Sequence, residues 1–455
     1  MTEQSTAQDG LWEQLVARVG EDDARFLVST LEHLDPPGRI SDLAKIEAEQ
    51  EARGAGFLGM LPSQTAAPLP VPEDPDAVLA TALALAEIRE GHLEAIRSAF
   101  GDSYALTFTG QELPAAAEAP LPQGWALELD VSGIRAVLDY IAAGRSDQQG
   151  AMAVARMAPF QEMMRHRREL GYVPEPLIDD DGFAWCLMKA GSDDPVHAIW
   201  RWLSPHNLFD LADLAQHHSQ FEDLVARLEG QGELLGTAIL SRLAPFAPKG
   251  APFVDRLTFA VGWAIRGWAT DVTGGINIEH IKDDFAQCLD TLVHETFHRL
   301  QLRICPKDPL GKTSGFESLT VGSYGSSQDQ VLYRALCYVM LEGSATYVGG
   351  GVRSEGDEAR GAGIDLLERV LDVDADRGDE TSDALLNEGL KSNGPFYGLG
   401  ARMSQAIVDR DGSHALGEAL AAGAPAFFTR ALEADRTLAE RFPGRLLSSI
   451  RRLVS

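Results

Sequence analysis

The sequence predicts a mainly helical fold of the α+β class, in which a small sheet lies beside one long helix. Apolar residues recur with a helical period over most of residues 131–453. Two short runs, residues 257–263 and 274–280, have instead the pattern of strands, and the second alternates apolar with polar residues. The long helix, residues 282–304, follows these runs directly, so we expect the sheet to lie next to it.

The first 123 residues differ in composition from the rest of the chain. Two stretches rich in Ala and Pro, residues 61–75 and 113–123, are typical of extended linkers. Helical patterns occur before and between these stretches, at residues 11–33 and 77–98. We therefore expect an N-terminal helical region with linkers over residues 1–123 and a larger domain over residues 124–455.

The elements expected in the larger domain follow one another in a simple order. Helices come first, at residues 131–143, 151–170, 180–189 and 209–229. Two or three strands at residues 255–280 precede three further helices, at residues 282–304, at residues 328–347 and from Asn393-Gly394-Pro395 onward. Pro is well tolerated in a first helical turn, because its missing N–H would have no helical partner there. A helical C-terminus, residues 415–453, completes the domain.

Charge and cysteine content limit the classes of protein to consider. The chain has 39 Lys and Arg against 68 Asp and Glu, a net charge of −29, which disfavours nucleic acid and anionic membranes as partners. No run approaches the roughly 18 apolar residues of a membrane span, and residues 1–20 lack the basic and apolar segments of a signal peptide. We therefore expect a cytoplasmic protein. The four cysteines form no C-x-x-C pattern and predict free buried thiols: Cys186, Cys288, Cys305 and Cys337.

The most informative motif is H-E-x-x-H, formed by His294, Glu295 and His298 within the helix of residues 282–304. Residues four apart on a helix lie about 40° apart around the axis and about 6 Å apart along it, so both imidazoles leave the same face. Two neutral imidazoles suit zinc, which in a catalytic site needs a third protein ligand and an open position. Glu295 can reach a water on the metal and act as general base.

The third ligand is predicted on the apolar helix of residues 328–347, where Glu342 is an isolated acid near the middle. A buried carboxylate is usually paired or bound to a metal, so Glu342 is our candidate zinc ligand. The small residues Gly343, Ser344 and Ala345 should let this helix approach the first one closely. The alternative is a helix that ends at Glu342 with Gly343 as its C-cap.

H-E-x-x-H followed on a later helix by E-G-x-A-x-Y, residues 342–347, resembles the gluzincin metallopeptidases. Within them the chain is similar to a poorly characterised family of zinc-dependent peptidases, which often have a Tyr-x-x-Gly-x-x-Met helix like that of residues 394–403. The motifs span roughly residues 255–410. The gap between His298 and Glu342 is longer than in the thermolysin-like branch, so that branch's downstream histidine is not carried over. The resemblance implies a zincin-like peptidase domain over residues 124–455, one Zn²⁺ ion and a peptide or protein substrate.

Three further residues are candidates for supporting roles. In gluzincin-like enzymes a tyrosine or histidine often donates a hydrogen bond to the oxyanion, and Tyr397 is our candidate for that role, with Tyr347 as the reserve. An ordinary amphipathic tyrosine with its hydroxyl at the surface is the alternative. Asp290 lies four residues before His294, where it either accepts a hydrogen bond from a ligand imidazole or forms a salt bridge.

The strand at residues 274–280 is a candidate substrate-binding strand. In zinc peptidases the edge strand beside the cleft commonly pairs with the substrate backbone. Gly274 and Gly275 would let a substrate chain approach closely. An ordinary structural hairpin is the competing interpretation.

These expectations combine into hydrolysis of a peptide bond by a metal-activated water. Zinc held by His294, His298 and Glu342 would lower the pKa of the water and polarise the scissile carbonyl. Glu295 would take the proton from the water and pass it to the leaving amine. Two rivals remain: a catalytically inactive, metal-binding interaction module derived from a peptidase, and a helical scaffold that binds no metal.

Overall fold

A computed structural model describes most of the chain beyond residue 120. The described residues are 12–17, 21, 24, 121–144, 147–169, 180–189, 211–248, 250, 252–261, 267–278, 285–309, 317–322, 326–350, 357–372, 379–390 and 394–454. Residues 12–17 are helical, within the helix predicted at residues 11–33. The helix predicted at residues 77–98 and most of both linkers lie outside the described residues.

Four strands form one mixed sheet in the order β1-β2-β4-β3. The strands are β1 (Trp125–Asp130), β2 (Phe253–Ala260), β3 (Gly267–Ala269) and β4 (Gly274–Asn277). β2 pairs in parallel with both β1 and β4, and β3 pairs antiparallel with β4. The small sheet and two or three strands near residues 255–280 were predicted, and three are present there, whereas β1 was not predicted. Its partner lies far along the chain, and only Trp125 of β1 is fully buried, so the local pattern was weak.

The prediction that residues 274–280 form a half-exposed edge strand is wrong. All four residues of β4 are buried, and β4 lies between β2 and β3. The alternation of apolar and polar residues was misleading because Asn277 is buried. Neighbouring side chains fill the space over the glycines: a Cβ on Gly275 would lie 1.9 Å from the indole of Trp268. β3 and β4 therefore form the ordinary hairpin of the alternative interpretation.

Most of the helices between β1 and β2 agree with the sequence pattern. They are α5 (Ser132–Ala142), α6 (Gln148–Ala155), α7 (Ala158–Glu169), α8 (Asp180–Lys189), α10 (Leu211–Gln216) and α11 (His218–Leu243), followed by the 3-10 turn η2 (Ala244–Phe246). The single helix expected at residues 151–170 is divided into α6 and α7, because Pro159 fits only a first helical turn. The single helix expected at residues 209–229 is divided into α10 and α11. α11 continues 14 residues beyond the predicted end at residue 229, since its apolar face continues through Leu235 and Ile239.

Three helices carry the predicted site residues: α12 (Phe285–Ile304), α13 (Ser327–Val348) and α16 (Pro395–Asp411). α13 continues past Glu342 and is capped by Gly349, so the alternative of a helix end at Glu342 is excluded. α16 starts with Pro395 in its first turn, as predicted, but its N-cap is Gly394, which has no side chain, and not a residue with a capping side chain. Gly343 serves a contact that we had not expected. A Cβ there would lie 2.2 Å from Cα of Gly400, so its lack of a side chain admits α16, not α12.

The remaining helices surround this group. They are the 3-10 turn η4 (Glu317–Leu319), α14 (Asp357–Leu371), α15 (Asp379–Leu390), α17 (Ser413–Ala421), α18 (Ala424–Ala434), α19 (Arg436–Arg441) and α20 (Gly444–Val454). The predicted helical C-terminus is confirmed, although it consists of four short helices. Gly412 precedes the first of them and Gly423 separates the first from the second, and their φ angles of 85° and 89° favour glycine.

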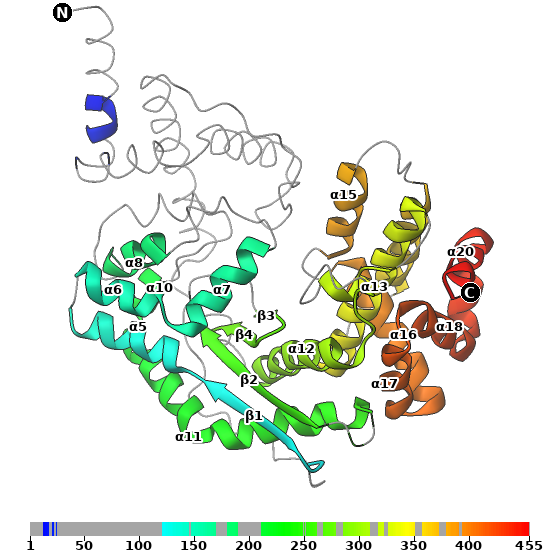
Figure 1. Cartoon of the computed structure of the whole chain (residues 1–455), viewed down its shortest axis with the longest axis horizontal. Helices are drawn as coiled ribbons and strands as arrows, with labels where there is room; N and C mark the ends of the chain where they lie inside the picture. Colours follow the sequence, from blue (N-terminus) through cyan, green and yellow to red (C-terminus); the bar gives the residue numbers. More distant parts are fainter. Residues whose placement is uncertain are drawn as a thin grey trace, which may run out of the picture.

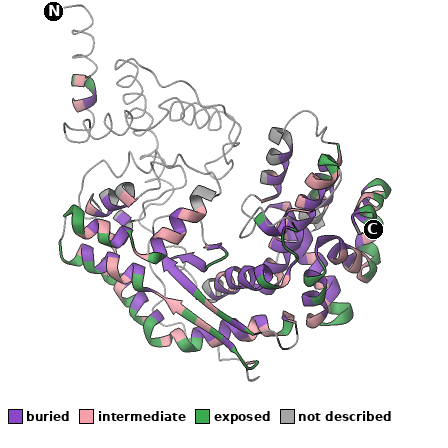
Figure 2. Ribbon diagram, viewed as in Figure 1, coloured by how far each residue is buried: buried purple, intermediate pink, exposed green. Residues whose placement is uncertain are grey.

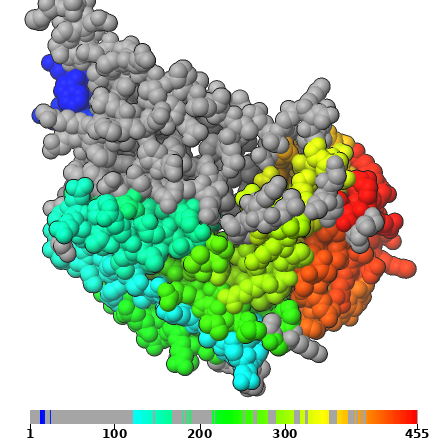
Figure 3. Space-filling view, in the orientation of Figure 1, coloured from blue at the N-terminus to red at the C-terminus, as the bar shows by residue number. Residues whose placement is uncertain are grey.

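The sheet and the C-terminal helices lie on opposite sides of α12 and α13. α11 packs along β1, and α12 contacts β3 and β4 on one side and α13 on the other (Figure 1). In the space-filling view, yellow-green residues lie between the cyan and green residues and the orange and red C-terminal helices (Figure 3). α12 therefore occupies the middle of the described domain, and it is buried along most of its length (Figure 2).

Among the described helices, none is both long enough and apolar enough to cross a membrane.

Candidate metal centre

The two histidines of the H-E-x-x-H motif lie on the face of α12 that meets α13. Leu289, Val293, Phe297 and Leu300 bury the helix among its neighbours, which keeps the motif away from bulk water. The side chains of His294 and His298 point the same way, with ring centroids 4.6 Å apart. Glu342 extends toward them from α13. The three ligand atoms lie within 4.8 Å of one another, a group we call the histidine cluster, and within the described residues it is the group suited to hold a metal ion.

The spacing of the histidine cluster fits one small cation. The Nε2 atoms of His294 and His298 are 3.0 Å apart. Oε2 of Glu342 lies 3.5 Å from the first of them and 3.4 Å from the second. A triangle of these dimensions places each atom about 1.9 Å from the common centre, close to the zinc–ligand bond lengths of about 2.0–2.2 Å. The predicted convergence of Glu342 on both histidines is confirmed.

Electrostatic coupling within the histidine cluster is strong. Burial alone would lower the pKa of His298, but the nearby carboxylate of Glu342 raises it to about 9. Burial alone would raise the pKa of Glu342, but the two imidazoles hold it well below its usual range. The carboxylate is therefore ionised near neutral pH. A site with an ionised carboxylate and two imidazole nitrogens favours a bound cation.

Glu295 lies beside the histidine cluster and against the sheet. Its side chain is buried, and burial raises the pKa of its carboxyl group. A Cβ on Gly267 would lie 2.4 Å from Cγ and Cδ of Glu295, so the absence of a side chain on β3 makes room for this carboxylate. β3 is the outer strand of the described sheet. The general-base candidate is thus adjacent to an edge strand, although not the strand that the sequence indicated.

Gln301 contacts the histidine cluster and was missed by the sequence analysis. Its Oε1 lies 2.7 Å from Nδ1 of His298, and its Nε2 donates to the carbonyl of Leu341 at 2.8 Å. The residue lies three positions after His298, on the same face of α12. That spacing was a usable signal, because histidine ligands usually donate their second ring N–H to an acceptor.

Asp290 forms the salt bridge that was one of its two predicted roles. Nη1 of Arg242 on α11 lies 2.7 Å from Oδ1 of Asp290, and Nη2 donates to the carbonyl of Val348 at 3.2 Å. Arg242 therefore joins α11 to α12 and to the end of α13. A Cβ on Gly349 would lie 3.3 Å from Cβ of His294, so this junction lies close to the histidine cluster.

The two predicted tyrosines lie on different helices. Tyr397 is half-buried in the first turn of α16, where its N–H donates to the carbonyl of Gly394 at 3.1 Å. Its role as an oxyanion donor stays a prediction. Tyr347 lies about 140° around α13 from Glu342. Its ring packs edge-on against Phe246, and its hydroxyl is hydrogen-bonded to Gln405 of α16.

A further tyrosine, Tyr338, precedes Glu342 by one turn of α13. Burial raises the pKa of its phenol, a hydrogen bond and the charge of Arg334 lower it, and the charge of Glu342 raises it again. Its hydroxyl is therefore within electrostatic range of the Glu342 carboxylate. The spacing of four residues was a signal for this position that the sequence analysis did not use.

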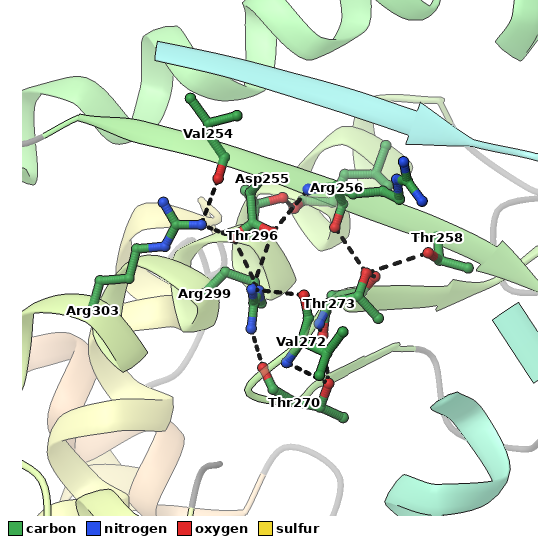
Figure 4. A network of polar contacts seen from close by, with 12 residues as sticks. Val254, Asp255, Arg256, Thr258, Thr270, Val272, Thr273, Thr296, Arg299 and Arg303 are labelled. Carbon is green, nitrogen blue, oxygen red and sulfur yellow. Dashed lines mark hydrogen bonds and ion pairs between the residues drawn. The ribbon is translucent and has the colours of Figure 1, made fainter. Parts of the chain in front are cut away.

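A second polar group, which we call the arginine cluster, consists of the buried side chains of Asp255 and Arg299 and the partly exposed Arg303. Arg299 follows His298 directly and points to the sheet, where its Nε and Nη2 each lie 3.1 Å from the Asp255 carboxylate (Figure 4). Its guanidinium also donates to the carbonyls of Thr270 and Val272. Arg303 donates to Asp255 at 2.8 Å. The arginine cluster therefore fixes α12 to β2 and to the turn between β3 and β4.

Comparisons with known proteins place the chain in no group. No protein-family model, no curated protein and no solved structure matches it.

Proposed function

We propose that this protein is a metal-dependent hydrolase of peptide bonds, of the gluzincin type that its motifs resemble. The observation that carries the proposal is the convergence of His294, His298 and Glu342 beside a buried Glu295. A structural metal site needs no such carboxylate, since structural zinc is held by four protein ligands.

Zinc is the metal that we propose for the histidine cluster. Two imidazoles and one carboxylate are a known ligand set of catalytic zinc, and the spacing of the three atoms suits its bond lengths. When bound, such a metal would polarise a scissile carbonyl and lower the pKa of a water.

Glu295 is the proposed general base. Its carboxylate would accept a proton from the attacking water and then deliver it to the leaving amine. Burial raises the pKa of this carboxyl, which makes its carboxylate a better proton acceptor than that of an exposed glutamate. Tyr397 is the proposed donor of the hydrogen bond to the oxyanion.

We propose that the substrate backbone pairs with the outer edge of β3. In the described sheet β3 has one neighbour, β4, and it ends a sheet that lies directly beside Glu295. An extended peptide added at this edge would run past the general base, as in other cases of strand addition. The substrate would be a peptide or protein, and the acidic charge of the chain disfavours nucleic acid and membranes. We propose a cytoplasmic location.

The decisive experiment compares Glu295→Gln with the zinc-loaded wild-type protein on an unbiased peptide library. Glu295→Gln should keep the fold and the metal but lose hydrolysis by about 10²–10⁴-fold, the usual contribution of a general base. Glu388→Gln is the matched control, because Glu388 pairs with Arg369 at the surface. Equal cleavage by Glu295→Gln would refute the proposed mechanism. A zinc-loaded wild-type protein that cleaves nothing would favour the inactive binding module.

A further inference from the structure

Gln301 is a fully buried amide whose polar atoms all have partners on two helices. It is 0% exposed. Its Oε1 lies 2.7 Å from Nδ1 of His298, while its Nε2 lies 2.8 Å from both the Leu341 carbonyl and Oγ of Ser344. One side chain of α12 thus connects a member of the histidine cluster to the α13 backbone next to Glu342.

The direction of each hydrogen bond follows from the chemistry of the partners. The Leu341 carbonyl can only accept, so it must face the NH₂ group of Gln301. The hydroxyl of Ser344 donates its hydrogen to the carbonyl of Met340 at 2.6 Å. Its Oγ must therefore accept from the NH₂ group of Gln301. The amide oxygen is left to face His298, and an oxygen there requires a proton on Nδ1.

We infer that Gln301 is a positioning residue that presents the Nε2 lone pair of His298 to a metal. With the proton of the neutral ring held on Nδ1, the lone pair is on Nε2, which lies 3.4 Å from Oε2 of Glu342. The opposite amide orientation would bring two buried oxygens together at Leu341, and an unsatisfied buried group costs about 1–3 kcal/mol. The inference rests on the metal site of the proposed function, but not on peptide cleavage.

The same amide keeps the two ligand-bearing helices in register. Leu341 is the residue immediately before Glu342. A shift of α13 along α12 that moved the Glu342 carboxylate would therefore also break the hydrogen bond between Gln301 and the Leu341 carbonyl. Ser344 is also 0% exposed, so water does not replace these bonds. Gln301 therefore fixes both the ring orientation of His298 and the distance at which Glu342 approaches it.

The test measures metal affinity in variants of the full chain, with Zn²⁺ in competition with a chelating indicator and Co²⁺ for its electronic spectrum. Gln301→Met keeps the size of the side chain and removes all its hydrogen bonds. We expect it to weaken Zn²⁺ binding by about 10–100-fold and to change the Co²⁺ spectrum. Gln301→Glu keeps an oxygen toward His298 and should lose less affinity. The matched control is Thr296→Val, which removes one buried hydrogen bond, to Leu292, from the same helix.

A second readout follows the proton itself. In the zinc-loaded protein, the Nδ1 proton of His298 should exchange slowly with solvent in the wild type and in Gln301→Glu, and rapidly in Gln301→Met. Ser344→Ala removes one of the two acceptors on α13 and should give an intermediate loss of affinity, which keeps the test available if Gln301→Met does not fold.

The outcomes separate this inference from the proposed function. Wild-type Zn²⁺ affinity in Gln301→Met, or in both Gln301→Glu and Ser344→Ala, would overturn the role of Gln301. A wild-type protein that binds no zinc would overturn it as well. Tight zinc binding that depends on Gln301, without cleavage of any peptide, would refute the hydrolase and support the positioning role.

Discussion

The histidine cluster and the arginine cluster include consecutive residues of α12, His298 and Arg299, and they accommodate polar groups in different ways. In the arginine cluster the donors of Arg299 and Arg303 meet the carboxylate of Asp255 and three backbone carbonyls. The guanidinium of Arg299 and the carboxylate of Asp255 therefore find their partners within the protein. In the histidine cluster three potential metal-ligand atoms lie 3.0–3.5 Å apart. Within the cluster itself, only protons on the imidazoles can offset the proximity of these three lone-pair atoms.

This difference in hydrogen bonding indicates which of the two clusters is suited to bind a ligand. Buried polar groups are stable when every donor meets an acceptor, and the buried side chains of the arginine cluster meet this condition within the protein. The histidine cluster meets it either by protonation, which the raised pKa of His298 favours, or by binding a cation. We therefore treat the arginine cluster as structural and the histidine cluster as a binding site. Three predictions test this division; the third compares two arginines within the structural cluster.

The largest expected effect is on metal content. His298→Ala removes one of three ligands, so after loading and dialysis the zinc content should fall from about one ion per chain to almost none. Metal analysis of the purified protein measures this directly. Removal of zinc by a chelator should lower the melting temperature of the wild type, because binding to the folded state stabilises it. The same treatment should leave His298→Ala unchanged.

Two controls sharpen this result. Glu295→Gln should keep its zinc, because Glu295 is placed as a base and not as a ligand. His414→Ala removes a histidine of α17 that pairs with Glu418 at the surface, and it should bind zinc like the wild type. Equal loss of zinc in His298→Ala and Glu295→Gln would contradict the roles assigned here.

The next largest effect concerns the arginine cluster and should appear in stability alone. Arg299→Met leaves the Asp255 carboxylate, whose side chain is 3% exposed, without its main partner. We expect a loss of about 3 kcal/mol in the free energy of unfolding, the lower end of the range for a broken buried pair, because Arg303 still pairs with Asp255. Urea denaturation measures the change. Zinc content should stay at the wild-type value, and its loss would show that the clusters are not independent.

The sequence predicted the site better than the sheet, and the reason is the range of the interactions. The geometry of His294, Glu295 and His298 follows from the helical repeat alone, so their convergence needed no tertiary information. Glu342 was found because an isolated acid in an apolar helix requires a partner.

Longer-range contacts were harder to foresee. Asp255 and Arg299 are 44 positions apart, and neither lies in a pattern that indicates the other. Gly343 was correctly interpreted as a site of close approach, but a glycine does not say which helix approaches it. β1 was missed for a similar reason, since its strand pairing with β2 depends on residues far along the chain.

The smallest effect is expected at Arg303, and it tests whether burial decides the importance of a charge in the arginine cluster. The side chain of Arg303 is 36% exposed, against 6% for Arg299, so water can replace much of its interaction with Asp255. Its guanidinium also lies 4.5 Å from the ring centroid of Phe253. Arg303→Ala should therefore cost about 1 kcal/mol, the sum of a partly exposed ion pair and a cation–π contact. Arg256→Ala is the matched control, because Arg256 pairs with Glu128 on the exposed side of β2 and should change stability even less. If urea denaturation shows that Arg303→Ala destabilises the protein as much as Arg299→Met, the cluster acts as one unit. The exposure of each arginine would then not determine how much it contributes to stability.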